Sequence, residues 1–199
     1  MRNFLNINTL SEKNVFQLVK RAIALKSGDT PKHLPITAVN LFFENSTRTY
    51  SSFQMAENRL NWQKIIINPQ TSSMTKGESL IDTLKTLKAI GVDVAVIRHS
   101  QNAWYKNLLT VTGHDLPQLV NAGDGSGQHP SQSLLDLVTI YEEFSRFKGL
   151  KIRIVGDLAH SRVARSNAEI LNNLGATLTF SGPDSWRPDD FTTFGTYTD

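Results

Sequence analysis

Cysteine does not occur among the 199 residues of the sequence. Disulfide bonds and thiolate-bound metals are therefore excluded, and a reducing compartment is permitted. Long apolar runs are missing as well. No stretch of 18 apolar residues is present, and the opening MRNFLNINTLSEKN lacks the apolar centre of a secretory signal. We therefore expect a cytoplasmic protein with no membrane partner.

Blocks of like charge are also absent. The sequence holds 21 Lys and Arg against 18 Asp and Glu, a net charge of +3, with no run of five or six like charges. A basic arm for nucleic acid is poorly supported, and we expect no nucleic-acid partner. The small positive excess suits an anionic small-molecule substrate at least as well.

Strand-like and helix-like segments alternate along the chain. Val15, Val19 and Ala22 share one face of a helix that Ser11 can cap and Gly28 can end. Apolar runs predict strands at 36–43, 64–68, 92–97, 116–122, 150–157 and 176–183, and helical spacing predicts helices that include 104–111, 132–147 and 164–174. This alternation predicts an α/β fold with a parallel sheet flanked by helices. The glycine-rich segment 123–127 is expected to be a loop, and a second domain is expected to begin near residue 150.

The first candidate site is the segment STRT, residues 46–49, which follows a predicted strand and opens a predicted helix. Free N–H groups at a helix N-terminus hold anions, and Ser46, Thr47 and Thr49 add hydroxyl donors. Arg48 can direct two donors to one phosphate. The segment is not a P-loop, because the pattern GxxxxGK[ST] is absent. A plain N-cap with a surface arginine would explain the same residues.

Two further candidates follow later strands. Arg98 closes the apolar strand 92–97, where ligands bind in parallel sheets, although a salt bridge at the rim is the simpler explanation. His129 begins the long helix and can stabilise a carbonyl oxygen that becomes negative in a transition state. Gln132, one turn along, can bind an amide nitrogen. The alternative is that His129 caps the helix and Pro130 is an ordinary first-turn proline.

The polar segment 71–79 carries Lys76 and precedes a helix, so it can act as a mobile anion clamp or simply as a solvated loop. Arg162 lies in the first turn after another predicted strand and can bind a carboxylate, or can be a surface arginine. Arg48, Arg98, His129 and Arg162 all follow the carboxyl ends of predicted strands. Independent surface residues would scatter, so we expect these four to gather at one edge of the sheet.

The ordered motifs FFENSTRT, SxxxKGES with DT, IRH, GDGSGQHPSQ and GDLAHSRVARSN run over almost the whole chain. In this order and spacing they resemble the catalytic chain of the aspartate carbamoyltransferases, most closely the bacterial forms. The resemblance implies the carbamoyltransferase fold: a complete first domain at 1–149 that binds carbamoyl phosphate, then the start of a second, Rossmann-like α/β domain at 150–199 that binds aspartate. It also implies transfer of the carbamoyl group to L-aspartate, which yields N-carbamoyl-L-aspartate and phosphate in pyrimidine synthesis.

The resemblance implies a role for each matching residue. The phosphate is held by Ser46, Thr47, Arg48 and Thr49, and Arg98 also contacts carbamoyl phosphate. His129 polarises the carbamoyl carbonyl, Gln132 binds the carbamoyl amine, and Arg162 binds an aspartate carboxylate. Ser72 and Lys76 match a loop that enters the neighbouring subunit's site, which implies a homotrimer with shared sites. Catalysis then rests on Arg48, His129 and Lys76, with no metal, no cofactor and no covalent intermediate.

Two departures and two alternatives remain. Tyr50 stands where the family often has a basic residue, which we expect to be tolerated because the four preceding positions contact the phosphate. Chains of the family continue past the position of Asp199, so we expect a fragment that is inactive by itself. Ornithine carbamoyltransferases share the STRT and HPxQ motifs, but Arg98-His99, Lys76-Gly77-Glu78 and the GDGSGQ segment favour aspartate as the acceptor. The chain as given can also be a non-catalytic module that binds carbamoyl phosphate or phosphate.

Overall fold

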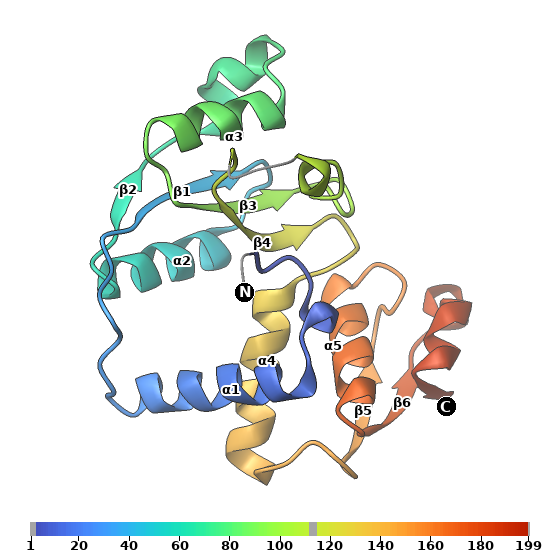
Figure 1. The fold of residues 1–199 in the computed structure, drawn as a ribbon. Coiled ribbons are helices and arrows are strands. Elements are labelled where there is room, and N and C mark those ends of the chain that lie inside the picture. Colours follow the sequence, from blue (N-terminus) through green and yellow to red (C-terminus); the bar gives the residue numbers. More distant parts are fainter. Residues whose placement is uncertain (1–2, 112–114, 199) are drawn as a thin grey trace. The chain divides into compact units, whose positions relative to one another are not determined.

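The computed structural model describes residues 3–111 and 115–198 (Figure 1). The chain divides into two compact units: Met1–Leu5 with Thr30–Gly125, and Asn6–Asp29 with Ser126–Asp199. In the described part of the chain, no helix is long and apolar enough to cross a membrane. The units do not follow the sequence-based boundary at residue 150, because the first long helix and the helix at 130–144 group with the later residues.

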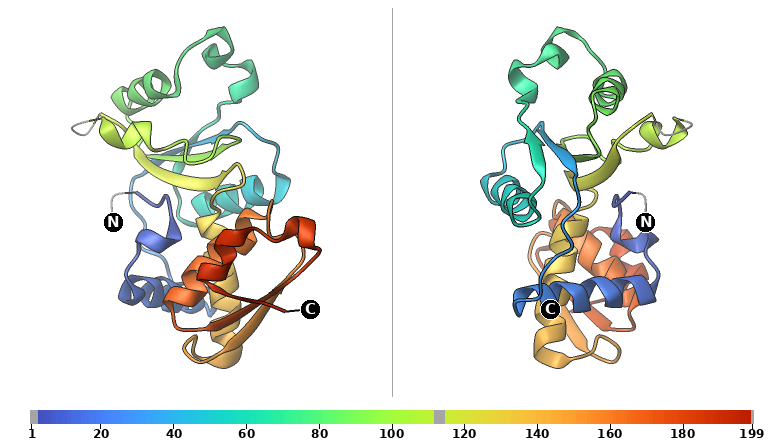
Figure 2. Two further views of the ribbon diagram at one scale, coloured as in Figure 1. Left: turned by 90° about the vertical axis from the view of Figure 1, so that its right-hand side faces the viewer. Right: turned by 60° about the vertical axis from the view of Figure 1, so that its left-hand side comes forward.

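The first unit is built on a four-stranded parallel sheet in the order β2-β1-β3-β4. Its strands are β1 (Thr37–Phe42), β2 (Gln63–Ile65), β3 (Val94–His99) and β4 (Gln118–Asp124). The helices α2 (Thr47–Arg59) and α3 (Leu80–Ala89) lie on opposite faces of this sheet (Figures 1 and 2). Because the four strands are parallel, their carboxyl ends lie at the same edge of the sheet.

Side chains of β1 alternate between two cores. Val39 and Leu41 pack with Leu84 of α3 in one apolar cluster, whereas Ala38 packs in a second cluster that Phe53 of α2 helps to cover. Strands buried on both faces read as continuous apolar runs, which is why 36–43 and 92–97 were predicted well. The burial of both faces leaves the strand ends as the exposed edge for ligands.

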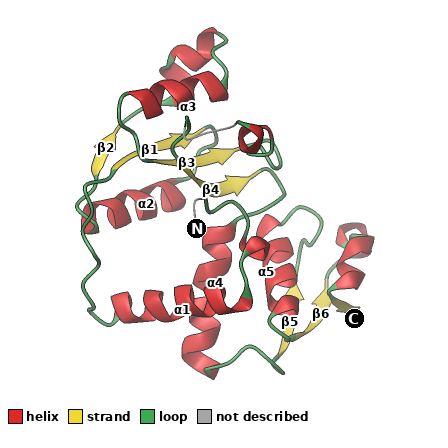
Figure 3. Ribbon diagram, viewed as in Figure 1, coloured by secondary structure: helices red, strands yellow, loops and turns green. Residues whose placement is uncertain are grey.

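The described residues of the second unit form three α-helices and a three-stranded parallel sheet in the order β5-β6-β7. Figure 3 shows its helices in red and its strands in yellow. The helices are α1 (Glu12–Lys26), α4 (Pro130–Phe144) and α5 (Arg162–Asn173), and the strands are β5 (Lys151–Val155), β6 (Thr177–Ser181) and β7 (Gly195–Tyr197). Phe16 of α1 packs against Tyr141 of α4 and against Phe147, with ring centroids 5.8 and 5.4 Å apart. The cap predicted at Ser11 is confirmed, since its hydroxyl accepts the N–H of Asn14.

Several sequence-based boundaries were wrong. Residues 104–111 form turns and a short 3-10 helix at Asn107–Thr110, because Trp104 and Leu108 are pulled into the sheet's core instead of lining a helix face. The strand predicted at 64–68 ends at Ile65, before the Asn68-Pro69 turn. The loop expected at 123–127 begins later, because β4 continues through Asp124. Strand β7 was not predicted, and strands β5 to β7 form a sheet of their own.

Candidate active site

The segment STRT occupies the N-terminus of α2, as predicted. Ser46 is the N-cap residue, with φ −158° and ψ 90°, and its side chain makes no capping hydrogen bond. The first turn of α2 contains no acidic residue, and Arg48 is exposed. Among the described residues, no ion pair or hydrogen bond involves the Arg48 guanidinium. A positive helix end with hydroxyls and an available guanidinium is chemically suited to holding an anion.

An open depression lies beside this helix end. It is lined by Phe42, Glu44, Asn45, Ser46, Thr47, Tyr50 and Ser51. The Tyr50 ring packs edge-on against Phe42, with ring centroids 5.1 Å apart and an interplanar angle of 88°. Tyr50 therefore forms a wall of the depression, which is a structural role for a residue that departs from the basic residue of the resembling family.

Arg98 lies at the same strand edge. It is the last residue but one of β3 and lies opposite Phe42 of β1. It is 8% exposed, and its Nη1 donates to the carbonyl of Ala122 at 3.3 Å. Its Nε lies 3.4 Å from a carboxylate oxygen of Glu44, a residue that also lines the depression. The salt bridge considered from the sequence is therefore present, and it places the guanidinium next to the cradle at 46–49.

His99 follows Arg98 and was not singled out as a site residue. Its Nδ1 accepts the N–H of Gln101 at 2.9 Å, and its ring packs 4.8 Å from Phe43. Burial lowers the pKa of His99, and the carboxylate of Glu44 raises it by less. A neutral imidazole with an accepting Nδ1 agrees with both observations. His99 thus fixes the backbone at the strand edge.

In the second unit, His129 is the N-cap of α4, and Pro130 follows it at the first helical position. Its side chain makes no capping hydrogen bond, contrary to the capping alternative. The backbone N–H of His129 donates to Ser166 at 3.1 Å, and Nδ1 lies 3.4 Å from the Ser131 hydroxyl. The residue is 7% exposed, so its backbone is held firmly by α5.

Gln132 follows one turn into α4. Its Nε2 donates to Asp136 at 3.1 Å, and Asp136 also accepts from Asn167 at 2.6 Å. With the amide nitrogen directed at a carboxylate, the amide oxygen of Gln132 is the group that can accept a hydrogen bond from a ligand. This agrees with the predicted preference for an amide nitrogen.

Arg162 is the first residue of α5 and lies beyond the carboxyl end of β5. Ser161 caps this helix, with its hydroxyl accepting the N–H of Ala164 at 3.1 Å. Arg162 belongs to the second sheet, so the expectation that four residues gather at the edge of a single sheet was wrong. The structure unites Arg48 with Arg98 in one unit and His129 with Arg162 in the other.

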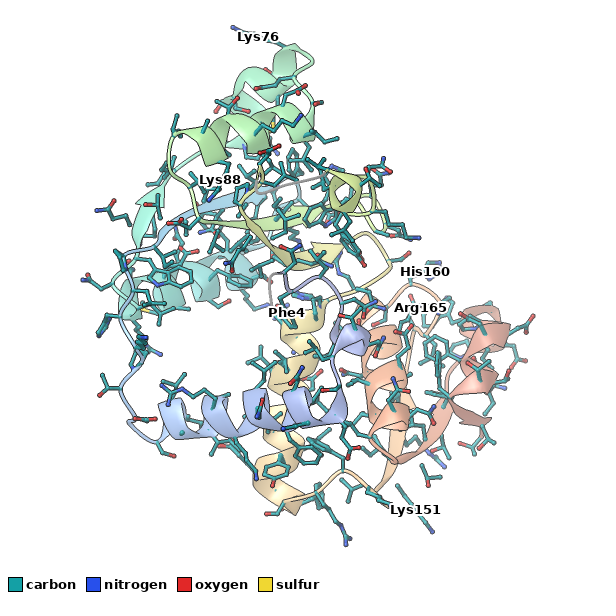
Figure 4. The ribbon with its side chains drawn as sticks, viewed as in Figure 1. Phe4, Lys76, Lys88, Lys151, His160 and Arg165 are labelled. Atoms are coloured by element: carbon teal, nitrogen blue, oxygen red, sulfur yellow. The ribbon has the colours of Figure 1, made fainter. Side chains whose placement is uncertain are left out.

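The segment that carries Lys76 is more ordered than a plain loop. It forms two 3-10 turns, Pro69–Thr71 and Ser73–Lys76, and then Gly77 at φ +96°. The Ser72 hydroxyl accepts the N–H of Met74 at 3.4 Å and donates to the carbonyl of Pro69 at 3.0 Å. Lys76 is exposed and projects outward (Figure 4). Neither Ser72 nor Lys76 lines the depression beside 46–49.

Three polar residues around His129 were missed. Gln128 and Ser166 are buried at 8% and 0% exposure, and Glu169 is part-buried with its pKa raised mainly by burial. No local pattern in the sequence points to them, because their burial and their partners depend on residues far along the chain. Residues 3–111 and 115–198 hold no cluster of three His, Asp or Glu that could bind a metal ion.

A helix N-terminus with hydroxyls and arginines at the edge of a parallel sheet is typical of α/β proteins that bind phosphate groups. The sequence matches the family described as aspartate/ornithine carbamoyltransferase, carbamoyl-P binding domain, over residues 2–142. The chain belongs to this family. The match covers every site residue of the first unit and also His129 and Gln132.

Curated proteins of similar sequence indicate which members of this family the chain resembles. The chain is 75% identical, over its whole length, to an aspartate carbamoyltransferase catalytic subunit of Leuconostoc mesenteroides subsp. mesenteroides, of which it covers 67%. It is 70% identical over 99% of its length to the corresponding subunit of Leuconostoc citreum, of which it covers 65%. The chain thus spans about two thirds of the length of these relatives.

Solved structures agree with this assignment. A catalytic subunit of M. Jannaschii aspartate transcarbamoylase is 30% identical, with a TM-score of 0.85 over 100% of this chain and 69% of that one. Aspartate transcarbamoylase of Trypanosoma cruzi, in complex with carbamoyl aspartate and phosphate, is also 30% identical, with a TM-score of 0.87 over 99% of this chain and 68% of that one. The fold expected from the resemblance is confirmed.

Proposed function

We propose that this protein acts in aspartate carbamoyltransfer, with carbamoyl phosphate as donor and L-aspartate as acceptor, in pyrimidine biosynthesis. The observation that carries the proposal is the cradle at 46–49, where a helix N-terminus without acidic residues lies beside the buried Arg98. Residues 1–149 would bind carbamoyl phosphate, and 150–199 would begin the aspartate-binding domain. The names of the similar proteins favour aspartate over ornithine.

The proposed reaction needs positioning and electrostatics only. The amine of aspartate attacks the carbamoyl carbon, a tetrahedral intermediate forms, and its C–O bond to phosphate breaks. The amine loses one proton, which the departing phosphate can accept. Ser46, Thr47, Arg48 and Thr49 hold the phosphate, so negative charge that develops on the leaving group is stabilised throughout.

Residues of the second unit would act on the carbamoyl group and the acceptor. In this proposal His129 donates to the carbonyl oxygen and Gln132 accepts from the carbamoyl amine, in agreement with the orientation of its amide. Arg162 binds an aspartate carboxylate. A single hydrogen-bond donor directed at a developing oxyanion typically lowers the activation free energy by about 2.7–4 kcal/mol.

The proposal includes a homotrimer in the cytoplasm, in which Ser72 and Lys76 serve the site of a neighbouring subunit. Its support is the resemblance, together with the exposed position of Lys76 outside the depression of its own unit. A lysine that reaches a site only from a neighbour would make assembly obligatory for turnover.

The test is an acceptor assay on two proteins: this chain, and a chimera that adds the remaining third of the Leuconostoc mesenteroides relative. We expect the chimera to release phosphate from carbamoyl phosphate with L-aspartate and not with L-ornithine. The Arg48→Ala chimera is the inactive control. Turnover with ornithine alone would overturn the choice of acceptor. A chimera that binds carbamoyl phosphate but never releases phosphate would favour the non-catalytic module.

A further inference from the structure

A continuous chain of hydrogen bonds reaches the backbone of His129 inside the second unit. It begins at Asn8, the middle residue of the 3-10 helix Ile7–Thr9. The side-chain amide nitrogen of Asn8 donates to Oε2 of Glu169 on α5. The same Oε2 accepts from Nε2 of Gln128 at 3.0 Å. Oε1 of Gln128 accepts the Ser166 hydroxyl at 3.0 Å, and the Ser166 oxygen accepts the His129 N–H at 3.1 Å.

The Glu169 carboxylate sets the donor and acceptor of every hydrogen bond in this series. An ionised carboxylate only accepts, so Asn8 and Gln128 must both turn their nitrogens towards Glu169. The amide oxygen of Gln128 then faces Ser166 and takes its single hydroxyl proton. With that proton used, the lone pairs of Ser166 face His129 and accept its N–H.

Burial makes the arrangement costly to break. Ser166 is fully buried, and Gln128 and His129 are 8% and 7% exposed, so water does not readily replace a lost partner. The amide oxygen of Asn8 is itself buried without a hydrogen-bond partner in the described structure. That orientation is favourable only because its nitrogen meets the carboxylate.

We propose that Glu169 is a positioning residue for His129, because it orients Gln128 and Ser166 so that they hold the backbone N–H at the start of α4. The importance of this contact for catalysis rests on the role proposed above for His129. The contact is present whatever that role is. Glu169 touches no substrate in this scheme. Its effect is to hold the backbone of His129, which has φ −137° and ψ 73°, at the start of α4.

The charged groups around Glu169 are Arg165 on the same helix and Asp190 in the 3-10 helix Asp189–Thr193. Burial raises the pKa of Glu169, the Gln128 hydrogen bond and Arg165 lower it, and Asp190 raises it further. Arg165 also forms an ion pair with Asp190. Lowering the pH should therefore protonate Glu169 and weaken its hold on both amides before ordinary exposed glutamates are protonated.

The experiment measures hydrogen exchange of the His129 backbone amide by NMR in this chain. Glu169→Leu should speed exchange at His129 at least tenfold, whereas Glu169→Gln, which is neutral but keeps an acceptor oxygen, should retain only the part of the protection that protonated Glu169 retains at low pH. Glu143→Leu, at an exposed glutamate of α4, is the matched control and should leave exchange within twofold. Amides of β6 should keep their protection in all variants, which separates a local effect from unfolding. Unchanged exchange at His129 in a folded Glu169→Leu protein would overturn the proposal.

A second measurement needs no destabilising variant. In the unsubstituted chain, the side-chain NH2 signals of Gln128 should titrate with Glu169, and protection of the His129 amide should fall over the same pH range. The Glu169→Gln variant should lack this step. Independent midpoints for Gln128 and His129 would overturn the proposal. Neither measurement involves substrate, so a failure of carbamoyl transfer in the chimera would refute the proposed function and leave this inference standing.

Discussion

Replacing Arg48 with alanine should remove most of the phosphate affinity of the first unit and almost none of its stability. Arg48 is exposed at the first turn of α2, and among the described residues its guanidinium has no internal partner to lose. A hydrogen bond to a charged group contributes about 1.5–3 kcal/mol. Two such bonds at an exposed, partly screened site should contribute about 3 kcal/mol together, which corresponds to roughly 100-fold in affinity. The free energy of unfolding should change by no more than about 0.5 kcal/mol.

The assay is calorimetric titration with inorganic phosphate, paired with urea denaturation of the same samples. Arg59→Ala provides the matched control, because Arg59 is an exposed arginine in the last turn of the same helix. That change removes the same charge but leaves the N-terminus intact. It should keep phosphate affinity within about twofold and cost about 0.3–1 kcal/mol through the helix dipole. Phosphate binding within threefold of the original in Arg48→Ala would refute the cradle at 46–49.

Three further outcomes are expected. Burial raises the pKa of Glu57, so the folded state holds this proton more tightly than the unfolded chain does. The free energy of unfolding should therefore fall as the pH rises above the ordinary glutamate pKa of about 4.3 and through the raised pKa of the folded state. Urea denaturation across that range should show a slope that Glu57→Gln removes, and an unchanged slope would contradict the assignment. Leu41→Ala should lower the free energy of unfolding by about 2–5 kcal/mol, because the Leu41 side chain is 0% exposed. Ile66→Ala should lower it by less than about 0.5 kcal/mol, because the Ile66 side chain is 80% exposed. Equal losses in urea denaturation would argue against the early end of β2. Mixed trimers of Lys76→Ala and Arg48→Ala chimeras should regain aspartate-dependent phosphate release, because some sites then combine an intact Arg48 from one subunit with an intact Lys76 from its neighbour. Verified mixed trimers without activity would count against a shared site.

Glu57 is a buried carboxyl group on α2, the helix whose N-terminus forms the cradle at 46–49. Its Oε2 accepts the Asn40 amide of β1 at 3.0 Å, and it is 2% exposed. Its Oε1 and the Asn40 amide oxygen are buried without hydrogen-bond partners in the described structure. Burial disfavours the charged carboxylate and raises the pKa of Glu57, and the Asn40 hydrogen bond and Lys64 lower it by less. The helix that carries the phosphate site is thereby tied to the central strand by a polar contact.

Local signals predicted much of the fold. Apolar runs located β1 and β3, because strands buried on both faces need apolar side chains at every position. Helical spacing together with Ser11 located α1, because a capping hydroxyl is needed where backbone N–H groups lack partners. Signals failed where long-range packing decides. The apolar spacing of Trp104 and Leu108 resembles a helix, yet both side chains serve the core of the sheet from a 3-10 turn.

The candidate site divides in the same way. Residues 46–49 were predictable because a strand, a turn and a helix N-terminus are all local features of the chain. The burial of Arg98 and its ion pair with Glu44 were not, because they depend on β3 lying beside β1. Glu169 was also invisible in the sequence, since its partners Asn8 and Gln128 are far from it along the chain.

The sequence by itself determined the alternation of strands and helices, the helix caps and the polar residues that follow each strand. These depend on neighbours within a few positions, whose side chains and backbone groups satisfy one another directly. Only the tertiary structure decided that the strands pair in the orders β2-β1-β3-β4 and β5-β6-β7, that Arg98 is buried, and that Ser166 holds His129 while Glu169 holds Gln128. Those outcomes come from the burial of apolar faces and the pairing of buried polar groups, which join residues that chain order keeps apart.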